Sequence, residues 1–463
     1  MAGIAGIDES KEDAVTQMLS RLTHRGEAGS KIVRGKDATL GAVWPRTQMV
    51  PTPAMLRRQA AWDGEQPPLP EAQQLGQEPD PFAMAAINLP HSLFLARDAL
   101  GICPLYYGYT AGGSFCFASE VKALLEVTQD VHVFPPGTMY TSEAGFSDYA
   151  PSSSPPLLEA ESDELAEGLR LRLERAVIRR ITGNEMGSWL SGGLDSSAIV
   201  ALASPHLSTL HTFAAGLAGA PDLKFAQEVA DYFGTVHHPV IVTPEQIVDA
   251  LPAVIYHLES FDALLVRSSI TNYLMARVAS DYSGAVFSGE GADELFAGYS
   301  YLQHIPAAEI KGELSDITRR LHNTALQRVD RSAAAHGMVT YVPFLDPEVV
   351  AYAQRIPAHL KLRRGKKTVE KWILRRALDD ALPASVLWRP KAKFWQGTGM
   401  DELLARHADR RITDADFRRE RRLPNGWTLN SKEELLYYRH FKAHFGELAN
   451  LDWMGRTKGA PTA

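Results

Sequence analysis

From about residue 185 onward, short apolar runs alternate with amphipathic segments, which predicts strands that alternate with helices. The runs that predict strands are 187–191, 210–217, 237–242 and 284–289, and those that predict helices are 196–204, 222–234, 245–259 and 270–280. Strands joined through helices form right-handed crossovers in a parallel, doubly wound sheet, so we expect an α/β fold. Beyond about residue 300 the pattern predicts mostly helices.

The first 145 residues have a different pattern, which predicts short strands and turns, with long loops over the Pro- and Gln-rich residues 44–90. The proline-rich stretch 147–164 reads as a linker, and we place a domain boundary near residue 155. A helix is expected to begin near Ser162 or Asp163, because either can cap it. Its apolar stripe comprises Leu165, Leu169, Leu173, Ala176, Val177 and Ile181.

The composition is that of a globular protein, with 45% hydrophobic and 22% charged residues among 463, a length that predicts two domains or three. A net charge of −7 argues against nucleic acid as the main partner, because phosphate binding needs a basic face. The two cysteines, Cys103 and Cys116, favour free thiols over a disulfide. No leader and no apolar run near ~20 residues is visible, so we expect a cytoplasmic protein without a membrane anchor.

Two glycine-rich loops follow apolar runs, “SGGLDSS” (191–197) and “SGEGADE” (288–294). In a doubly wound sheet both would lie at the carboxyl ends of strands, where ligands bind. The first loop lacks the lysine and spacing of a Walker A motif and is not a GxGxxG fingerprint, so it predicts another kind of pyrophosphate-binding loop. Asp195 beside a polyphosphate calls for Mg²⁺ between them, with Asp293 as the second carboxylate. The alternative is a Gly-Gly turn that only caps a helix.

Five motifs in register resemble the synthetase domain of glutamine-dependent asparagine synthetases, over nearly all of residues 160–400. They are “LSGGLDSS”, “SGEGADELFAGY”, “VPFLD”, “EKWILRRAL” and “LWRPKAKF”. The N-terminal part resembles the glutaminase domain of that family through “HRG”, “FLARDALGICPLYYG” and “FASEVKALL”. The resemblance implies a degenerate Ntn-hydrolase-like αββα domain over residues 1–155. It also implies a doubly wound, ATP-pyrophosphatase-type synthetase domain with a helical extension over residues 156–463.

In that family a carboxylate attacks the α-phosphate of ATP, pyrophosphate leaves, and an amine then displaces AMP. The resemblance therefore implies ATP and Mg²⁺, with Asp195 and Asp293 as the metal ligands. The positions that it assigns to ATP are Leu190, Ser191, Gly192, Gly193, Asp195, Ser196, Ser197, Ala215, Ser288 and Gly289.

Four more positions have roles implied by the resemblance. Glu290 suits a general base for the incoming amine. The related β-lactam synthetases have a tyrosine there, so Glu290 favours intermolecular amide formation over ring closure. Lys391 matches an essential lysine whose charge would offset that of the reacting phosphates. Lys371 is expected to act on phosphate in a similar way, and Arg267 matches a position in the acid-binding region.

The N-terminal part departs from the family at positions that glutamine hydrolysis needs. Ala2 stands where the family has its catalytic cysteine, and Asp63 stands where it has an asparagine. Without a thiolate there is no acyl-enzyme route from glutamine to ammonia. We therefore expect an inactive glutaminase-like domain and direct use of ammonia or a small amine.

The acid-binding region departs as well. Leu264 and Leu265 replace hydroxyl residues, and Val339, Thr340 and Tyr341 replace a Glu-x-Arg sequence. Polar groups of a substrate that find no partner in a pocket weaken its binding, so we expect an acid more apolar than aspartate.

The leading interpretation is an AMP-forming, ATP-dependent amide ligase of natural-product metabolism that joins a small carboxylic acid to ammonia or an amine. Glu290 and Arg267 favour one alternative, an ammonia-dependent asparagine synthetase. A non-catalytic nucleotide-binding protein is the other alternative. We expect neither nucleic acid nor a membrane as a partner, and a homodimer could form through an exposed face of the N-terminal domain.

Overall fold

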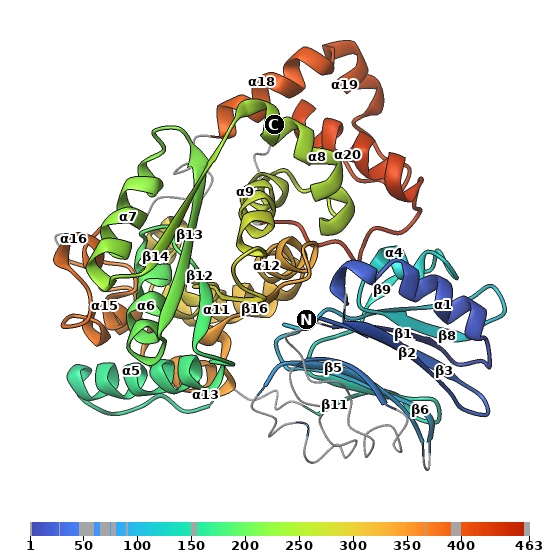
Figure 1. The fold of residues 1–463 in the computed structure, drawn as a ribbon, viewed down its shortest axis with the longest axis horizontal. Coiled ribbons are helices and arrows are strands. Elements are labelled where there is room, and N and C mark those ends of the chain that lie inside the picture. The colour runs from blue at the N-terminus through green and yellow to red at the C-terminus, as the bar shows by residue number, and fades with distance from the viewer. Residues whose placement is uncertain are drawn as a thin grey trace.

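The computed structural model describes residues 2–26, 28–45, 60–64, 75, 80–88, 91–149, 155–365, 367–389 and 400–457. Figure 1 shows two bodies side by side, formed by residues 2–149 and 155–457, which we call the N-terminal and C-terminal halves. The predicted linker lies partly outside the described residues, and the boundary near residue 155 stays a prediction.

Two stacked antiparallel sheets form the N-terminal half (Figure 1). The six-stranded sheet has the order β2-β3-β1-β8-β7-β9, over Gly29–Arg34, Thr39–Trp44, Gly3–Ile7, Phe115–Ala118, Tyr106–Tyr109 and His132–Val133. The five-stranded sheet has the order β11-β10-β6-β5-β4, over Gly145–Asp148, Thr138–Thr141, His91–Arg97, Phe82–Asn88 and Ala60–Gly64. Helices α1 (Glu12–Ser20) and α4 (Val121–Leu124) pack on the six-stranded sheet, where α1 buries Val15, Met18 and Leu19.

A five-stranded parallel sheet forms the centre of the C-terminal half, as the alternating pattern predicted. Its order is β14-β13-β12-β15-β16, over Val236–Val242, Thr209–Leu217, Glu185–Trp189, Ala285–Phe287 and Val339–Tyr341. The chain builds outward from β12 to β14 and then returns to the other side of β12 for β15. This reversal makes a doubly wound sheet whose switch point lies between β12 and β15.

Helices cover both faces of this sheet (Figure 1). Helices α6 (Leu194–Ala203) and α7 (Pro221–Phe233) lie on one face, and α9 (Ala263–Ala279) and α12 (Ala325–Ala334) lie on the other. Helix α6 is apolar on nearly all sides and buried accordingly.

Helix α5 spans Ser162–Arg179 and begins where the sequence predicted. It packs on α6 and on two helices of the C-terminal extension, α13 (Pro347–Arg355) and α15 (Trp372–Ala377). Within α5, the buried residues of the predicted apolar stripe are Leu165, Leu169, Leu173, Ala176 and Val177.

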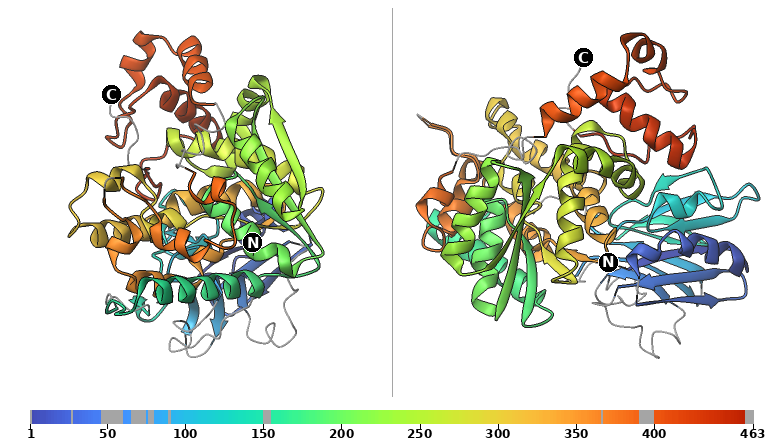
Figure 2. Two further views of the ribbon diagram at one scale, coloured as in Figure 1. Left: turned by 90° about the vertical axis from the view of Figure 1, so that its left-hand side faces the viewer. Right: turned by 45° about the horizontal axis from the view of Figure 1, so that its top comes forward.

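The remainder of the C-terminal half is mostly helical, as predicted. Its helices are α8 (Pro244–Leu258), α10 (Ala292–Phe296), α11 (Ile310–Arg319), α14 (Ala358–Lys361), α16 (Ala384–Leu387), α18 (Asp401–Arg411), α19 (Asp414–Glu420) and α20 (Lys432–Phe445). Figure 2 shows α18, α19 and α20 (red) at one end of the molecule, where α20 packs on α8. No helix within the described ranges is both long and apolar enough to span a membrane.

Candidate functional site

The two glycine-rich loops lie at neighbouring positions because β12 and β15 pair in parallel, with Ser188 opposite Phe287. Both strands end at the same edge of the sheet, so residues 190–194 and 288–291 emerge side by side at the switch point. The structure thus brings together the two segments that the sequence singled out.

The first loop is held by its own hydroxyl groups. The backbone N–H of Ser191 donates to Ser196 Oγ at 3.1 Å, and that of Gly193 donates to Ser191 Oγ at 3.3 Å. Gly192 has a φ of +68°, and a Cβ there would lie 2.4 Å from the backbone of Phe225. Gly193 caps α6 without a side chain, so the first-turn N–H groups of this helix are available to an anion.

The second loop touches the first. A Cβ on Gly289 would lie 2.8 Å from the backbone N of Ser196 and 2.8 Å from the carbonyl carbon of Asp195. Only a glycine allows this approach, which places Ser288 and Gly289 beside the amino end of α6.

Asp195, Asp293 and Lys371 meet at this edge. The Lys371 Nζ lies 2.6 and 2.5 Å from the two Asp195 carboxylate oxygens and 2.5 Å from Asp293 Oδ1. Lys371 is 3% exposed and has a φ of +54°, immediately before α15. Burial alone would lower the pKa of Lys371, but the two carboxylates outweigh burial and raise it.

The two carboxylates suit a divalent cation that arrives with a nucleotide. They converge on one ammonium group, so both point into the same small volume. Mg²⁺ in nucleotide sites is commonly bound by one or two carboxylates, with phosphate and water oxygens as the other ligands. No cluster of three or more metal-ligating side chains occurs in the part of the chain that the structure describes. Asp195 and Asp293 are therefore the residues that would hold it.

Glu290 faces α12, where its carboxylate pairs with the guanidinium of Arg328. Four residues on, Glu294 is buried and accepts a hydrogen bond from the Tyr299 hydroxyl. Burial, together with the Asp293 and Glu290 carboxylates, raises the pKa of Glu294 to about 8. Sequence reasoning missed Arg328, because a lone charge on a helix carries no motif, and it gave no role to Glu294 and Tyr299 although both lie in the motif of residues 288–299.

Arg389 lies in the motif “LWRPKAKF”, but no role was predicted for it. Its guanidinium donates to Asp222 Oδ1 at 2.7 Å and to the Ser191 carbonyl at 3.4 Å. It thereby ties the segment after α16 to the first glycine-rich loop. Lys391, two residues later, lies outside the described residues.

Other predicted positions lie as follows. The Leu190 N–H donates to the Phe213 carbonyl at 2.8 Å, and Ala215 lies in β13 opposite Val240. Ser197 is fully buried in α6. The Arg267 guanidinium binds the Glu433 carboxylate of α20, with Nε 2.6 Å from Oε1.

The other positions of the expected acid-binding region lie in α9 and in the edge strand β16. Leu265 is buried in α9 and Leu264 is half-buried. The segment Val339–Tyr341 forms β16 at the edge of the parallel sheet and is entirely buried.

Comparison with known proteins places these features in a family. Residues 168–313 and 311–458 match the asparagine synthase family, and residues 81–126 match a glutamine amidotransferase domain. The chain is 39% identical over 366 residues to an asparagine synthetase [glutamine-hydrolyzing] 2 of Oryza sativa subsp. japonica, covering 72% of this chain and 60% of that protein. It is 37% identical over 395 residues to the enzyme of Asparagus officinalis, covering 79% and 65%.

The chain therefore spans about 60% of the length of the curated relatives that it matches. The NMN synthetase of Francisella tularensis is similar in structure at a TM-score of 0.29 with 13% identity, covering 63% of this chain and 99% of that one. That likeness is too low to carry an argument. The family match extends over more than half of the residues and includes both glycine-rich loops, so the chain belongs to the asparagine synthase family.

Proposed function

We propose that this chain is an ATP-dependent amide ligase that adenylates a carboxylic acid and passes the acyl group to ammonia or a small amine. The observation that carries the proposal is the convergence of Asp195, Asp293 and Lys371 beside a glycine-rich loop at the switch point. Membership in the asparagine synthase family supports the same class of reaction. The division into domains near residue 155 belongs to this proposal.

In the first half-reaction a carboxylate oxygen of the acid attacks the α-phosphorus of ATP. The new P–O bond forms as the bond to the β-phosphate breaks, and pyrophosphate leaves. The loop of residues 191–197 and the amino end of α6 accept the pyrophosphate. Mg²⁺ held by Asp195 and Asp293 would offset the phosphate charge, and Lys371 and Lys391 would supply fixed positive charge.

In the second half-reaction the amine nitrogen attacks the acyl carbon of the adenylate. The C–O bond to AMP breaks, AMP leaves with the electron pair, and the nitrogen loses a proton. The Glu290 carboxylate accepts this proton, with Arg328 fixing its orientation.

We also infer that this chain does not hydrolyse glutamine. The sequence contains two cysteines, and both are buried and form no disulfide. Burial raises the pKa of Cys116 to about 12, and a nucleophilic thiolate needs the opposite shift together with access to substrate. The amine would then reach the ligase from solution or from another protein.

The proposed acid is more apolar than aspartate, which fits a role in natural-product metabolism. Leu264, Leu265 and the buried strand β16 support this choice. The Glu433 carboxylate on Arg267 supports it too, because it already neutralises the cation that a second substrate carboxylate would need. An ammonia-dependent asparagine synthetase is the second candidate, supported by the similarity to plant asparagine synthetases.

Carboxylate-dependent exchange of labelled pyrophosphate into ATP tests the proposal. A panel would contain L-aspartate, aliphatic acids and aromatic acids, each with MgCl₂. We expect exchange with an apolar acid, and loss of this exchange in Asp195→Asn. The control Lys367→Met, which changes an exposed lysine, should keep full exchange. Exchange with L-aspartate alone would establish the second candidate, and ATP binding without exchange would leave a nucleotide-binding protein. Release of glutamate from glutamine would contradict the inferred loss of glutaminase activity.

A further inference from the structure

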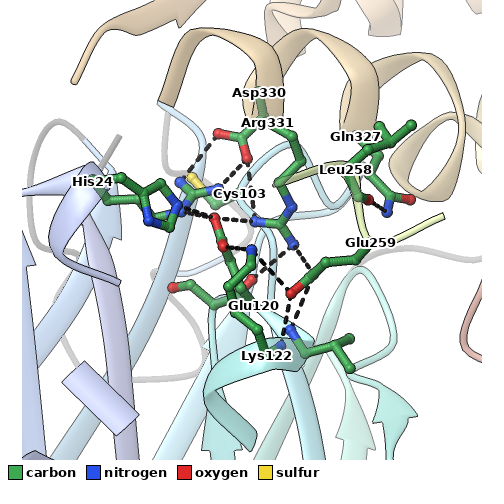
Figure 3. A network of polar contacts seen from close by, with 12 residues as sticks. His24, Cys103, Glu120, Lys122, Leu258, Glu259, Gln327, Asp330 and Arg331 are labelled. Carbon is green, nitrogen blue, oxygen red and sulfur yellow. Dashed lines mark hydrogen bonds and ion pairs between the residues drawn. The ribbon is translucent and has the colours of Figure 1, made fainter. Parts of the chain in front are cut away.

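A cluster of buried charges joins the two halves of the molecule (Figure 3). It contains three acids and three bases, so its formal charge balances. Every member is at most 6% exposed. The members are Arg25, Glu120, Lys122, Glu259, Asp330 and Arg331. We call this set the interhalf network.

Three residues of the N-terminal half bind α12 directly. The Arg25 guanidinium pairs with both carboxylate oxygens of Asp330, its Nη1 lying 3.3 Å from Oδ1. Glu120, which also pairs with Arg25, lies 2.9 Å from Arg331 Nη1. The Ser119 carbonyl accepts a second bond from Arg331 at 3.1 Å.

The end of α8 belongs to the same network. Glu259 accepts hydrogen bonds from the backbone N–H groups of Val121 and Lys122, at 3.1 and 2.7 Å. It also lies 3.2 Å from Arg331 Nη2. Gln327 of α12 donates to the Leu258 carbonyl at 2.6 Å. Helix α12 is therefore fixed from two sides.

The same helix reaches the candidate site. Arg328, which pairs with Glu290, lies one turn before Arg331 and two residues before Asp330. Arg328, Asp330 and Arg331 belong to one regular helix of ten residues. Contacts that hold Asp330 and Arg331 in place therefore also restrict the position of Arg328. The interhalf network is thus linked to Glu290 through one helix.

We propose that the N-terminal half positions the synthetase site, with Arg25 and Glu120 fixing α12 so that Arg328 holds Glu290. Arg25, Glu120, Asp330 and Arg331 are positioning residues, and the retained N-terminal half has this task whether or not it hydrolyses glutamine. The structural link stands on the contacts alone, and its effect on amide formation rests on the proposed function.

A charge-balanced double variant tests the link. Arg25→Met with Glu120→Gln removes one positive and one negative charge, so it leaves no net uncompensated charge in the buried cluster. Arg21→Met with Glu126→Gln is the matched control, since Arg21 Nε and Glu126 Oε1 also pair at 2.6 Å in the N-terminal half but are partly exposed. Helix α7, on the opposite face of the parallel sheet, serves as an internal reference.

Hydrogen exchange of the full chain is the first measurement. We expect amides of residues 288–294 and 325–334 to exchange about tenfold faster in the Arg25/Glu120 variant, while those of α7 and of the control variant keep their rates. Unchanged exchange at 288–294 would overturn the proposal, and so would an equal rise in α7. Should the double variant not fold, Arg331→Lys gives the same comparison, because it keeps the charge and loses the forked hydrogen bonding.

The second measurement separates the two half-reactions. With the acid that best supports exchange, pyrophosphate exchange in the Arg25/Glu120 variant should stay within about twofold, while kcat for amide formation from ammonium chloride falls about tenfold or more. Hydroxylamine, a stronger nucleophile near neutral pH, should restore much of that rate. An equal loss in both half-reactions would overturn the positioning role. If no acid supports exchange, the proposed function fails, and the hydrogen-exchange result still decides the link.

Discussion

Lys371 illustrates how much one residue can determine at this site. Its ammonium group lies within 2.6 Å of both carboxylates that the sequence marks as metal ligands. Without a bound cation the lysine supplies the positive charge that keeps Asp195 and Asp293 together.

Lys371→Met should leave two facing carboxylates without a counter-charge. We expect the free energy of unfolding to fall by about 1–3 kcal/mol without divalent cations, because two partly buried carboxylates lose their counter-charge. Millimolar MgCl₂ should raise the Tm of the variant more than that of the parent, since it replaces the missing charge. Thermal unfolding with and without MgCl₂ measures both effects.

The control for this variant is Lys367→Met, which removes an exposed lysine four residues away. Equal Mg²⁺ responses in Lys371→Met and the parent would contradict the assignment of the carboxylates to a cation site.

At the scale of elements, the site depends on close approaches between turns. Gly298 follows α10, and a Cβ there would lie 1.8 Å from Asp293 Oδ1 and 2.3 Å from Lys371 Cε. The turn can therefore close over the ion pair only if residue 298 has no side chain.

Gly298→Ala should displace Asp293 and Lys371 and weaken the binding of MgATP at least tenfold, as measured by calorimetry. Gly312→Ala is the matched control, because a Cβ at Gly312 of α11 would meet no atom within 4 Å. That control should raise the free energy of unfolding by about 0.5–1 kcal/mol, since alanine favours a helix over glycine. Unchanged MgATP affinity in Gly298→Ala would show that the turn does not shape the site.

The elements also show where sequence patterns succeed. Helices α5, α6, α7 and α8 were predictable because their periodic apolar positions coincide with one buried face or full burial. The strand β16 was not predicted from the sequence. Its hydrogen-bonded partner β15 lies more than 50 residues earlier, so pairing rather than local propensity makes it a strand.

At the scale of the whole molecule, buried histidines add an acid-sensitive component to the contact between the halves. His257 of α8 lies edge-on against His24 of the N-terminal half, with ring centroids 4.8 Å apart. Burial, with the charges of Lys122 and His24, lowers the pKa of His257 to about 2. His257 is therefore neutral in the folded protein throughout the physiological range.

The lowered pKa of His257 predicts how the free energy of unfolding changes with pH. Above pH 6.5 His257 is neutral in both states and has no effect on the pH dependence. Below it the unfolded chain binds a proton that the folded chain does not, so the free energy of unfolding falls by about 1.4 kcal/mol per pH unit. His257→Phe should remove about 2 kcal/mol of the loss between pH 6.5 and 4.5.

Urea unfolding of both proteins at several pH values gives this difference. His132→Gln is a control for replacing a histidine, since the His132 side chain is 41% exposed. Parallel pH profiles for the parent and His257→Phe would contradict a neutral buried His257.

The sequence alone determined the fold class, the parallel sheet with its crossover helices, and the two loops at its carboxyl edge. These features follow from local periodicity and from glycines whose spacing is readable in one dimension. The resemblance of five motifs added the family, which the comparison confirmed over residues 168–458.

Only the tertiary structure decided which charges face one another. Lys371 lies 176 residues from Asp195, Arg328 lies 38 residues from Glu290, and Arg25 lies 305 residues from Asp330. Arg267, a predicted substrate residue, proved to bind Glu433 of α20. A charged side chain looks alike in sequence whether it is solvated or paired, and its partner is fixed only when packing removes water and brings distant elements together.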